Sequence, residues 1–361
     1  MAPKLLLLLL SALSLSANAL AQVTCEKIGI LGEFKTATGR TVSPFGLDIR
    51  TGVQVALDKL KRDGRKICFT TVEIDINNSI ANIPGLIAQS IRKDGINIFL
   101  GLGISDQAIM ATEVLVKHNA LLITPTASSD ELVGPEFRQI MLFPRNSLIV
   151  EALAKETMRR GLKKVAIISE SNSTYSKNMA LQFRTQLQNL GGTVTTTLAA
   201  RKAAFSVNQI CSLKADSPQA IFMPIFELDA ARVISLLDKC AIHPLIIGAD
   251  SWGTDSKVIQ AATKAISFEA ILPQIYPLKE KPPQDLEFRT AMDKNRINDL
   301  SAFSYDGILF LAKLMETCSK ASLLQTPKLC VDKALPFESL TGPVPTATHL
   351  SLDRRVQVRN F

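Results

Sequence analysis

The chain has 361 residues, of which 47% are hydrophobic and 20% are charged, so its apolar content is sufficient for more than one folded core. Its formal net charge of +8 is spread along the sequence without an arginine-rich block interleaved with aromatic residues, which argues against nucleic-acid binding. The three histidines lie far apart and no C-x-x-C pair occurs, so a zinc site is not expected.

The N-terminal stretch, residues 1–21, has the pattern of an export signal. Lys4 precedes an uninterrupted run of leucines, and small residues with two A-x-A cleavage patterns follow. The apolar run is much shorter than the roughly 20 residues that cross a bilayer. We expect cleavage after Ala21, with Ala19 as the second choice. Because Cys25 lacks the small residue that a lipid anchor needs before it, we expect a soluble periplasmic protein.

In the first half of the chain, short apolar runs alternate with amphipathic stretches. The helix expected at residues 44–61 repeats apolar residues at i, i+3, i+4 and i+7, starting from Val53. The repeated strand–helix order predicts a parallel sheet with helices on both faces. The expected strands of this half cover residues 27–31, 68–76, 96–100 and 120–123.

The same strand–helix order starts again near residue 164, and a link rich in proline and lysine, residues 276–283, follows it. Two further helices come after the link. The expected fold class is therefore α/β, with two lobes that each contain a parallel sheet. The strands expected in the second lobe cover residues 164–168, 193–198, 220–224, 245–248 and 267–272.

Six cysteines in an exported chain indicate disulfides. Six cysteines allow fifteen pairings, and the sequence alone does not choose among them. We favour the pairs that lie on consecutive or adjoining elements. These are Cys25 with Cys68, Cys211 with Cys240, and Cys318 with Cys330.

The loops that follow the strands are where a ligand is expected, because open parallel sheets bind ligands beyond the carboxyl ends of their strands. These loops contain no catalytic motif: residues 101–105 do not match G-x-S-x-G, and Met179 stands where a lysine would have to follow Tyr175. We therefore expect a binding protein without a cofactor, and not an enzyme. The loops cover residues 101–105, 124–130, 169–175, 226–227 and 248–253.

The chain contains, in this order, the segments PFGLDIRTGVQVALDKL, DGINIFLGLGISDQA, LLITPTASSDEL, KKVAIISESNSTYSKNMALQF, LIIGADSWG and AFSYDGILFLAKLME. In the content and order of these segments, the chain resembles type I periplasmic binding proteins, specifically the leucine/isoleucine/valine-binding branch of ABC-transporter receptors. The resemblance implies two Rossmann-like lobes joined by a three-strand hinge. Lobe one would comprise residues 22–145 and 274–341, and lobe two residues 146–273 and 342–361.

The resemblance also implies which residues bind the ligand. Ser105, Thr126 and Ser128 would hold a carboxylate, which is consistent with the preference of hydroxyls and helix N-termini for anions. Tyr175 would cover the ligand when the lobes close, and Asp250 would pair with its ammonium group. The positions of further contacts would be Phe45, Phe226 and Glu227.

Each of these residues also has a purely structural interpretation. Asp250 lies in a turn and Ser105 begins a helix, positions at which aspartate and serine commonly cap the backbone. Glu227 belongs to a charge cluster with Asp229 and Arg232 that is typical of a solvated helix face.

The leading functional hypothesis is a monomeric receptor that delivers an amino acid or a related small polar ligand to an ABC permease of the inner membrane. A sensory protein that acts on a membrane receptor or kinase without transport is the main alternative. A third hypothesis is an exported interaction protein that kept the fold and lost the pocket.

Overall fold

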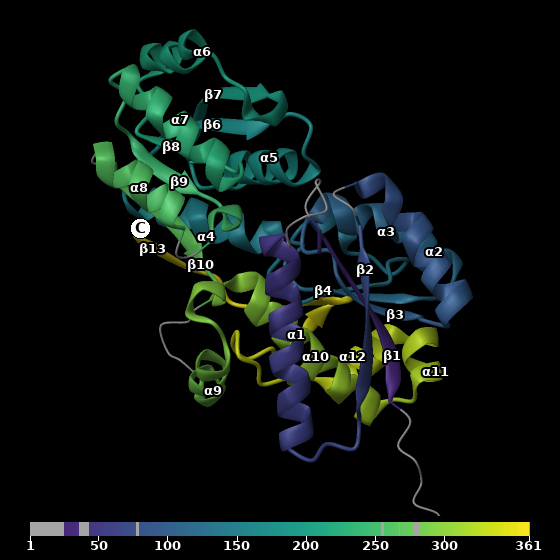
Figure 1. Cartoon of the computed structure of the whole chain (residues 1–361). Helices are drawn as coiled ribbons and strands as arrows, with labels where there is room; N and C mark the ends of the chain where they lie inside the picture. The colour runs from purple at the N-terminus through teal and green to yellow at the C-terminus, as the bar shows by residue number, and fades with distance from the viewer. Residues whose placement is uncertain are drawn as a thin grey trace, which may run out of the picture.

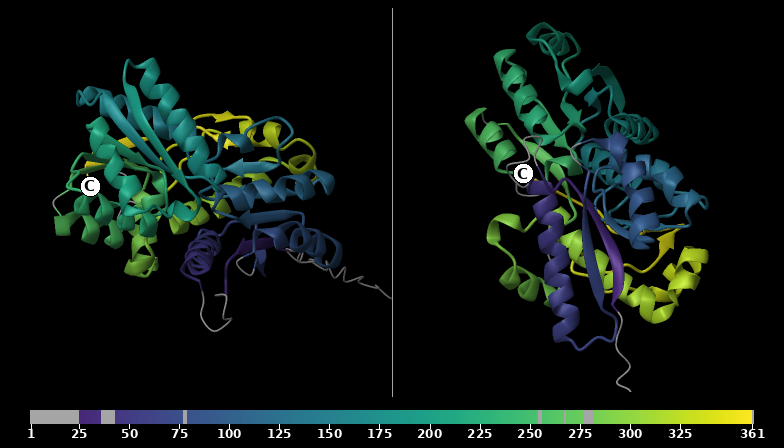
Figure 2. Two further views of the ribbon diagram at one scale, coloured as in Figure 1. Left: turned by 90° about the horizontal axis from the view of Figure 1, so that it is seen from above. Right: turned by 45° about the vertical axis from the view of Figure 1, so that its right-hand side comes forward.

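The computed structural model describes residues 25–35, 43–76, 79–253, 256–266, 268–276 and 282–360. These residues form two α/β lobes, each built on its own predominantly parallel sheet, so the expected fold class is confirmed (Figures 1 and 2). The expected export signal, residues 1–21, lies outside the described ranges. Within those ranges, none of the helices combines the length and the hydropathy that a bilayer-crossing segment needs.

The first lobe contains a seven-stranded sheet in the order β11-β12-β5-β4-β3-β1-β2. Neighbouring strands from β2 to β12 pair in parallel, and the short β11 pairs antiparallel with β12. The strands of this sheet are β1 (Glu26–Gly32), β2 (Phe69–Asp75), β3 (Ile98–Gly101), β4 (Leu121–Thr124), β5 (Gln139–Met141), β11 (Ala347–Thr348) and β12 (Ser351–Leu352).

Helices cover both faces of this sheet because its buried strands direct apolar side chains to alternate sides. In β3, Phe99 packs with residues of α2 and α3, whereas Ile98 and Leu100 belong to the core that includes α1 and α10. The helical elements of this lobe are α1 (Pro44–Arg62), η1 (Ile80–Asn82), α2 (Ile83–Asp94), α3 (Ser105–Lys117), η2 (Asp130–Leu132), α9 (Pro283–Ala291), η6 (Lys294–Arg296), α10 (Asp299–Thr317), α11 (Lys320–Gln325) and α12 (Pro327–Ala334).

The second lobe contains a six-stranded sheet in the order β13-β10-β9-β8-β6-β7. Its strands are β6 (Lys164–Glu170), β7 (Thr193–Ala200), β8 (Ala220–Met223), β9 (Leu245–Gly248), β10 (Ala270–Gln274) and β13 (Gln357–Asn360). Its helical elements are α4 (Asn146–Arg159), α5 (Thr174–Asn189), η3 (Arg201–Ala203), α6 (Val207–Cys211), η4 (Ser212–Asp216), α7 (Glu227–Lys239), η5 (Asp250–Trp252) and α8 (Lys257–Ile266).

The C-terminal tail differs from the expected division of the chain. We expected residues 342–361 to belong to the second lobe, but β12 pairs with β5 of the first lobe through Ser351 and Met141. Only β13 joins the second sheet, antiparallel to β10. The physical reason is that the hairpin of β11 and β12 covers the edge of β5, which would otherwise expose unpaired backbone groups.

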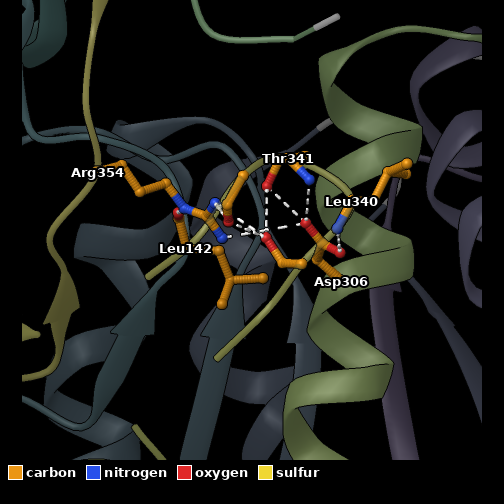
Figure 3. A network of polar contacts seen from close by, with 7 residues as sticks. Leu142, Asp306, Leu340, Thr341 and Arg354 are labelled. Carbon is orange, nitrogen blue, oxygen red and sulfur yellow. Dashed lines mark hydrogen bonds and ion pairs between the residues drawn. The ribbon is translucent and has the colours of Figure 1, made fainter. Parts of the chain in front are cut away.

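A buried polar network fixes the segment between β12 and β13, which is one of the crossings between the lobes (Figure 3). Asp306 of α10 accepts hydrogen bonds from the backbone N–H groups of Leu340 and Thr341 at 2.9 and 3.0 Å. The guanidinium of Arg354 lies 4.0 Å from the same carboxylate and donates to the carbonyl of Leu142. Burial lowers the pKa of Arg354 to about 10 and raises the pKa of Asp306. The network ties two crossings to α10, because Leu142 leads into the first one.

Three disulfides stabilise the two lobes. They join the residue before β1 to the residue before β2, the end of α6 to the end of α7, and the end of α10 to α12. The structure thus has the three pairs that were favoured from the sequence. They are Cys25–Cys68, Cys211–Cys240 and Cys318–Cys330.

A candidate ligand site between the lobes

The part of the site on the first lobe is built around the start of α3. Gly101 ends β3 with φ of +136°, and a Cβ at this position would lie 1.9 Å from the carbonyl oxygen of Leu31, so only glycine fits. The chain then turns into α3, whose first residue, Ser105, is 3% exposed. The Ser105 hydroxyl oxygen accepts hydrogen bonds of 3.2 Å from the backbone N–H groups of Ser128 and Ser129.

The loop between β4 and η2 is held against this helix start. The Thr126 hydroxyl donates to the carbonyl of Gly103 at 2.9 Å, and the Thr124 hydroxyl donates to the carbonyl of Leu102 at 2.8 Å. The structure therefore brings together the three residues expected from lobe one. Ser105 and Thr126 both make structural hydrogen bonds here, and their roles in ligand binding stay predictions.

The part of the site on the second lobe consists of Tyr175 near the start of α5 and Asp250 at the start of η5. The Tyr175 hydroxyl donates to Asp250 Oδ1 at 2.7 Å, and the backbone N–H of Ser251 donates to the same hydroxyl at 3.4 Å. Trp252, the only tryptophan in the chain, is 1% exposed and donates from Nε1 to the carbonyl of Ile225 at 2.8 Å. Trp252 is therefore a packing residue that fixes the loop carrying Asp250.

The two halves of the site meet at Asp250. The side chain of Ser128, which belongs to the other lobe, also lies close enough to this carboxyl group to lower its pKa. Burial raises the pKa of Asp250 to about 6, and the hydrogen bond from Tyr175 and the nearby Ser128 side chain offset part of this effect. Burial and the nearby Asp250 charge raise the pKa of Tyr175. At neutral pH, Asp250 is thus an enclosed carboxylate that accepts a hydrogen bond from the neutral hydroxyl of Tyr175, with Ser128 of the other lobe close by.

The remaining predicted contacts have different surroundings. The Phe226 ring lies 6.2 Å from the Tyr175 ring, centroid to centroid, and extends the site on the second lobe. Glu227 Oε2 accepts a hydrogen bond of 2.5 Å from the Ser256 hydroxyl, next to the start of α8. Phe45 lies in the first turn of α1 and is 52% exposed. The ligand roles of these three residues stay predictions.

Sequence reasoning did not find the residues that join the lobes beside the site. Asp106, in the first turn of α3, accepts a hydrogen bond from the backbone N–H of Thr174 at the start of α5. Figure 1 shows these two helices facing each other where the lobes meet. Both helices begin directly after strands, which can be predicted from the sequence. The angle between the lobes, which brings these helix starts together, cannot be predicted from local sequence patterns.

The chain matches the family model of the periplasmic binding protein over residues 27–346, and it therefore belongs to that family. A curated relative is the Leu/Ile/Val-binding protein BraC3 of Rhizobium johnstonii, with 24% identity over 249 residues. This match covers 67% of the present chain and 65% of the relative, slightly less than two thirds of its length.

Solved structures of the same class share the fold. LivJ from Streptococcus pneumoniae, in complex with isoleucine, matches with a TM-score of 0.77 and 17% identity over 94% of this chain and 100% of that chain. A solute-binding protein from R. palustris, in complex with 4-hydroxybenzoate, matches with a TM-score of 0.77 and 16% identity over 93% and 92% of the two chains. At 16–17% identity the likeness to these structures shows the shared fold, and the family to which the chain belongs is one of solute-binding proteins and not of enzymes.

Proposed function

We propose that this protein captures an amino acid between its lobes and delivers it to an ABC permease. The observation that carries the proposal is the enclosed carboxylate of Asp250, which accepts a hydrogen bond from the neutral hydroxyl of Tyr175 and lies near the Ser128 side chain of the other lobe. A buried charge is costly unless it is paired, and a ligand ammonium group would supply the missing opposite charge. Periplasmic location and delivery to a permease are inferred from family membership.

The start of α3 would bind the other charged group of an amino acid, its carboxylate. This helix spans 13 residues, and its N-cap, Ile104, has no side chain that caps the first N–H groups. A helix N-terminus favours an anion, and the hydroxyls of Ser105 and Ser128 lie beside it. A zwitterion placed here would direct its carboxylate to α3 and its ammonium group to Asp250.

A second class of ligand, an aromatic acid without an amine, is supported by the aromatic pair on the second lobe. Tyr175 and Phe226 lie 6.2 Å apart at an interplanar angle of 32°, an arrangement that suits an apolar or aromatic ligand side chain. The R. palustris structure with this fold contains 4-hydroxybenzoate. Such a ligand would use the anion end of the site and leave Asp250 with its present hydroxyl partner.

Thermal melting of the purified protein against a ligand panel tests these alternatives. The panel contains aliphatic and polar amino acids, their amine-free analogues such as 4-methylpentanoate, and aromatic acids such as benzoate. A ligand at about 100 times its Kd adds roughly 2.7 kcal/mol of stability, which is a measurable shift. The proposal predicts shifts with amino acids. Shifts only with amine-free acids would exclude the ammonium role of Asp250, and no shift with any compound would contradict ligand capture at this site.

A further inference from the structure

A second set of hydrogen bonds joins the two lobes outside the candidate site. The acceptors all belong to the first lobe, at the start of α3 and in or next to η2, and the donors all lie between the N-cap of α5 and the middle of that helix. The acceptors are Asp106, Ser129, Asp130 and Glu131, and the donors are Ser173, Thr174, Asn178 and Gln182.

Asp106 caps α5 from the opposite lobe. Its carboxylate accepts from the backbone N–H of Thr174 at 3.1 Å and from the Ser173 hydroxyl at 3.3 Å. The helix is 16 residues long, so the carboxylate lies at the positive end of a substantial dipole. Asp106 therefore stabilises α5 only while the lobes are closed.

The contacts continue along one face of α5. Asn178 donates from Nδ2 to Glu131 Oε1 at 2.8 Å, and Gln182 donates from Nε2 to Asp130 Oδ2 at 2.9 Å. Thr174, Asn178 and Gln182 are spaced four residues apart, which places them on the same side of a helix.

Asp130 also connects this row of contacts to the beginning of α4. Its carboxylate accepts from the backbone N–H of Ser147 at 2.9 Å and from the Ser147 hydroxyl at 2.6 Å. The row thus extends from the start of α5 to a helix that directly follows the first crossing between the lobes.

The row has a consistent chemical character. Asp106, Asp130 and Glu131 supply the carboxylates, whereas the side-chain and backbone donors on α5 are neutral. Hydrogen bonds to a charged group are stronger than those between neutral groups, and part of this strength survives competition with water. These contacts need no ligand, because each has both of its partners within the chain.

We propose that Asp106, Asn178 and Gln182 form a latch, a set of contacts between the lobes that favours closure of the empty protein. By favouring closure, the latch raises the affinity for every ligand by the same factor. The closure of the empty protein does not depend on the identity of the ligand. The common change in ligand affinity rests on the proposed function. In a two-state protein, the apparent affinity scales with the fraction of molecules in the binding-competent state. Residues that contact no ligand therefore change affinity without changing selectivity.

One electrostatic effect opposes the latch. Burial, followed by the charges of Asp229 and Asp106, raises the pKa of Glu170 at the end of β6. Closure therefore brings Asp106 toward another carboxylate as well as toward the start of α5. The substitution Asp106→Asn keeps an acceptor oxygen and removes the charge, whereas Asp106→Ala removes both. Comparison of the two variants separates the hydrogen bonds from the repulsion.

Small-angle X-ray scattering of the ligand-free protein is the primary test. The latch predicts that the wild type scatters as the closed form and that Asp106→Ala, or Asn178→Ala combined with Gln182→Ala, increases the radius of gyration. Matched controls are Glu113→Ala, an exposed acidic residue later in α3, and Gln188→Ala, an exposed residue later in α5. Circular dichroism verifies that each variant is folded. An unchanged radius of gyration in folded Asp106→Ala protein would overturn the latch.

Titration with two ligands of different side chains tests whether the latch changes all ligand affinities by the same factor. The Asp106→Ala protein is expected to bind both about tenfold more weakly, with the ratio of the two affinities unchanged. A loss confined to one ligand would show direct recognition and contradict the latch. If no ligand of the panel binds, the proposed function fails while the scattering result still decides whether the latch exists.

Discussion

Replacing Asp250 by asparagine is expected to change how the stability of the empty protein depends on pH. Burial raises the pKa of this carboxyl from the ordinary 3.8 to about 6, so the folded state binds its proton more tightly than the unfolded state does. Stability then falls as the pH rises through the window between these two values. Above about pH 6, Asp250 is ionised in the folded state as well, and the full free-energy cost of its buried charge destabilises the closed empty protein. An amide at this position does not titrate and removes this effect.

The size of the effect follows from the pKa difference. At about 1.4 kcal/mol per pKa unit, the shift to about 6 corresponds to at most about 3 kcal/mol, because Asp250 as a whole residue is partly exposed. Urea unfolding at several values between about pH 4 and pH 7 measures it, with Trp252 fluorescence as the probe. Trp252 is suitable because it is buried in the same turn as Asp250.

The wild type should lose stability relative to the Asp250→Asn protein as the pH rises across this window. A matched control is Glu269→Gln, which removes an exposed carboxylate from the same lobe. If the unfolding free energies of the wild type and the Asp250→Asn protein run parallel between about pH 4 and pH 7, the reasoning about the enclosed carboxylate is refuted.

Three further substitutions test the framework around the site. Arg354→Met leaves Asp306 buried without its cation and should cost about 3 to 5 kcal/mol in urea unfolding, and an unchanged midpoint would contradict this. Cys25→Ser with Cys68→Ser opens a bridge across 43 residues and should cost about 4 kcal/mol, whereas equal melting of oxidised and reduced wild type would argue against the bridge. Gly101→Ala should lower both the melting temperature and ligand affinity, and wild-type values of both would contradict the tight turn.

The central strands could be predicted from the sequence because each is a compact apolar run between turn residues. β9 has the expected bounds, Leu245–Gly248, and all four of its residues are buried. The short β5 carries no periodic signal in its three residues, and it was not predicted. β10 covers Ala270–Gln274, later than expected, because pairing with both β9 and β13 decides its position and local hydrophobicity does not.

The candidate site was predictable only in part. The loops after the strands and the family resemblance together indicated Ser105, Ser128, Tyr175 and Asp250, and the structure brings these four together. The contact of Asp106 with α5 joins residues 68 positions apart and depends on how far the lobes close. No local periodicity encodes such an angle, so the latch residues became visible only in three dimensions.

Calorimetric titration of the wild type and the Asp250→Ala protein with leucine and with its amine-free analogue 4-methylpentanoate tests the central claim most directly. If an amino acid binds with its ammonium group on Asp250, the wild type should prefer leucine. The Asp250→Ala protein should bind leucine about 100-fold more weakly than the wild type does, equivalent to about 2.7 kcal/mol. It should also lose nearly all of the preference for leucine over 4-methylpentanoate. Unchanged leucine binding in that variant, or equal binding of both compounds by the wild type, would contradict the account.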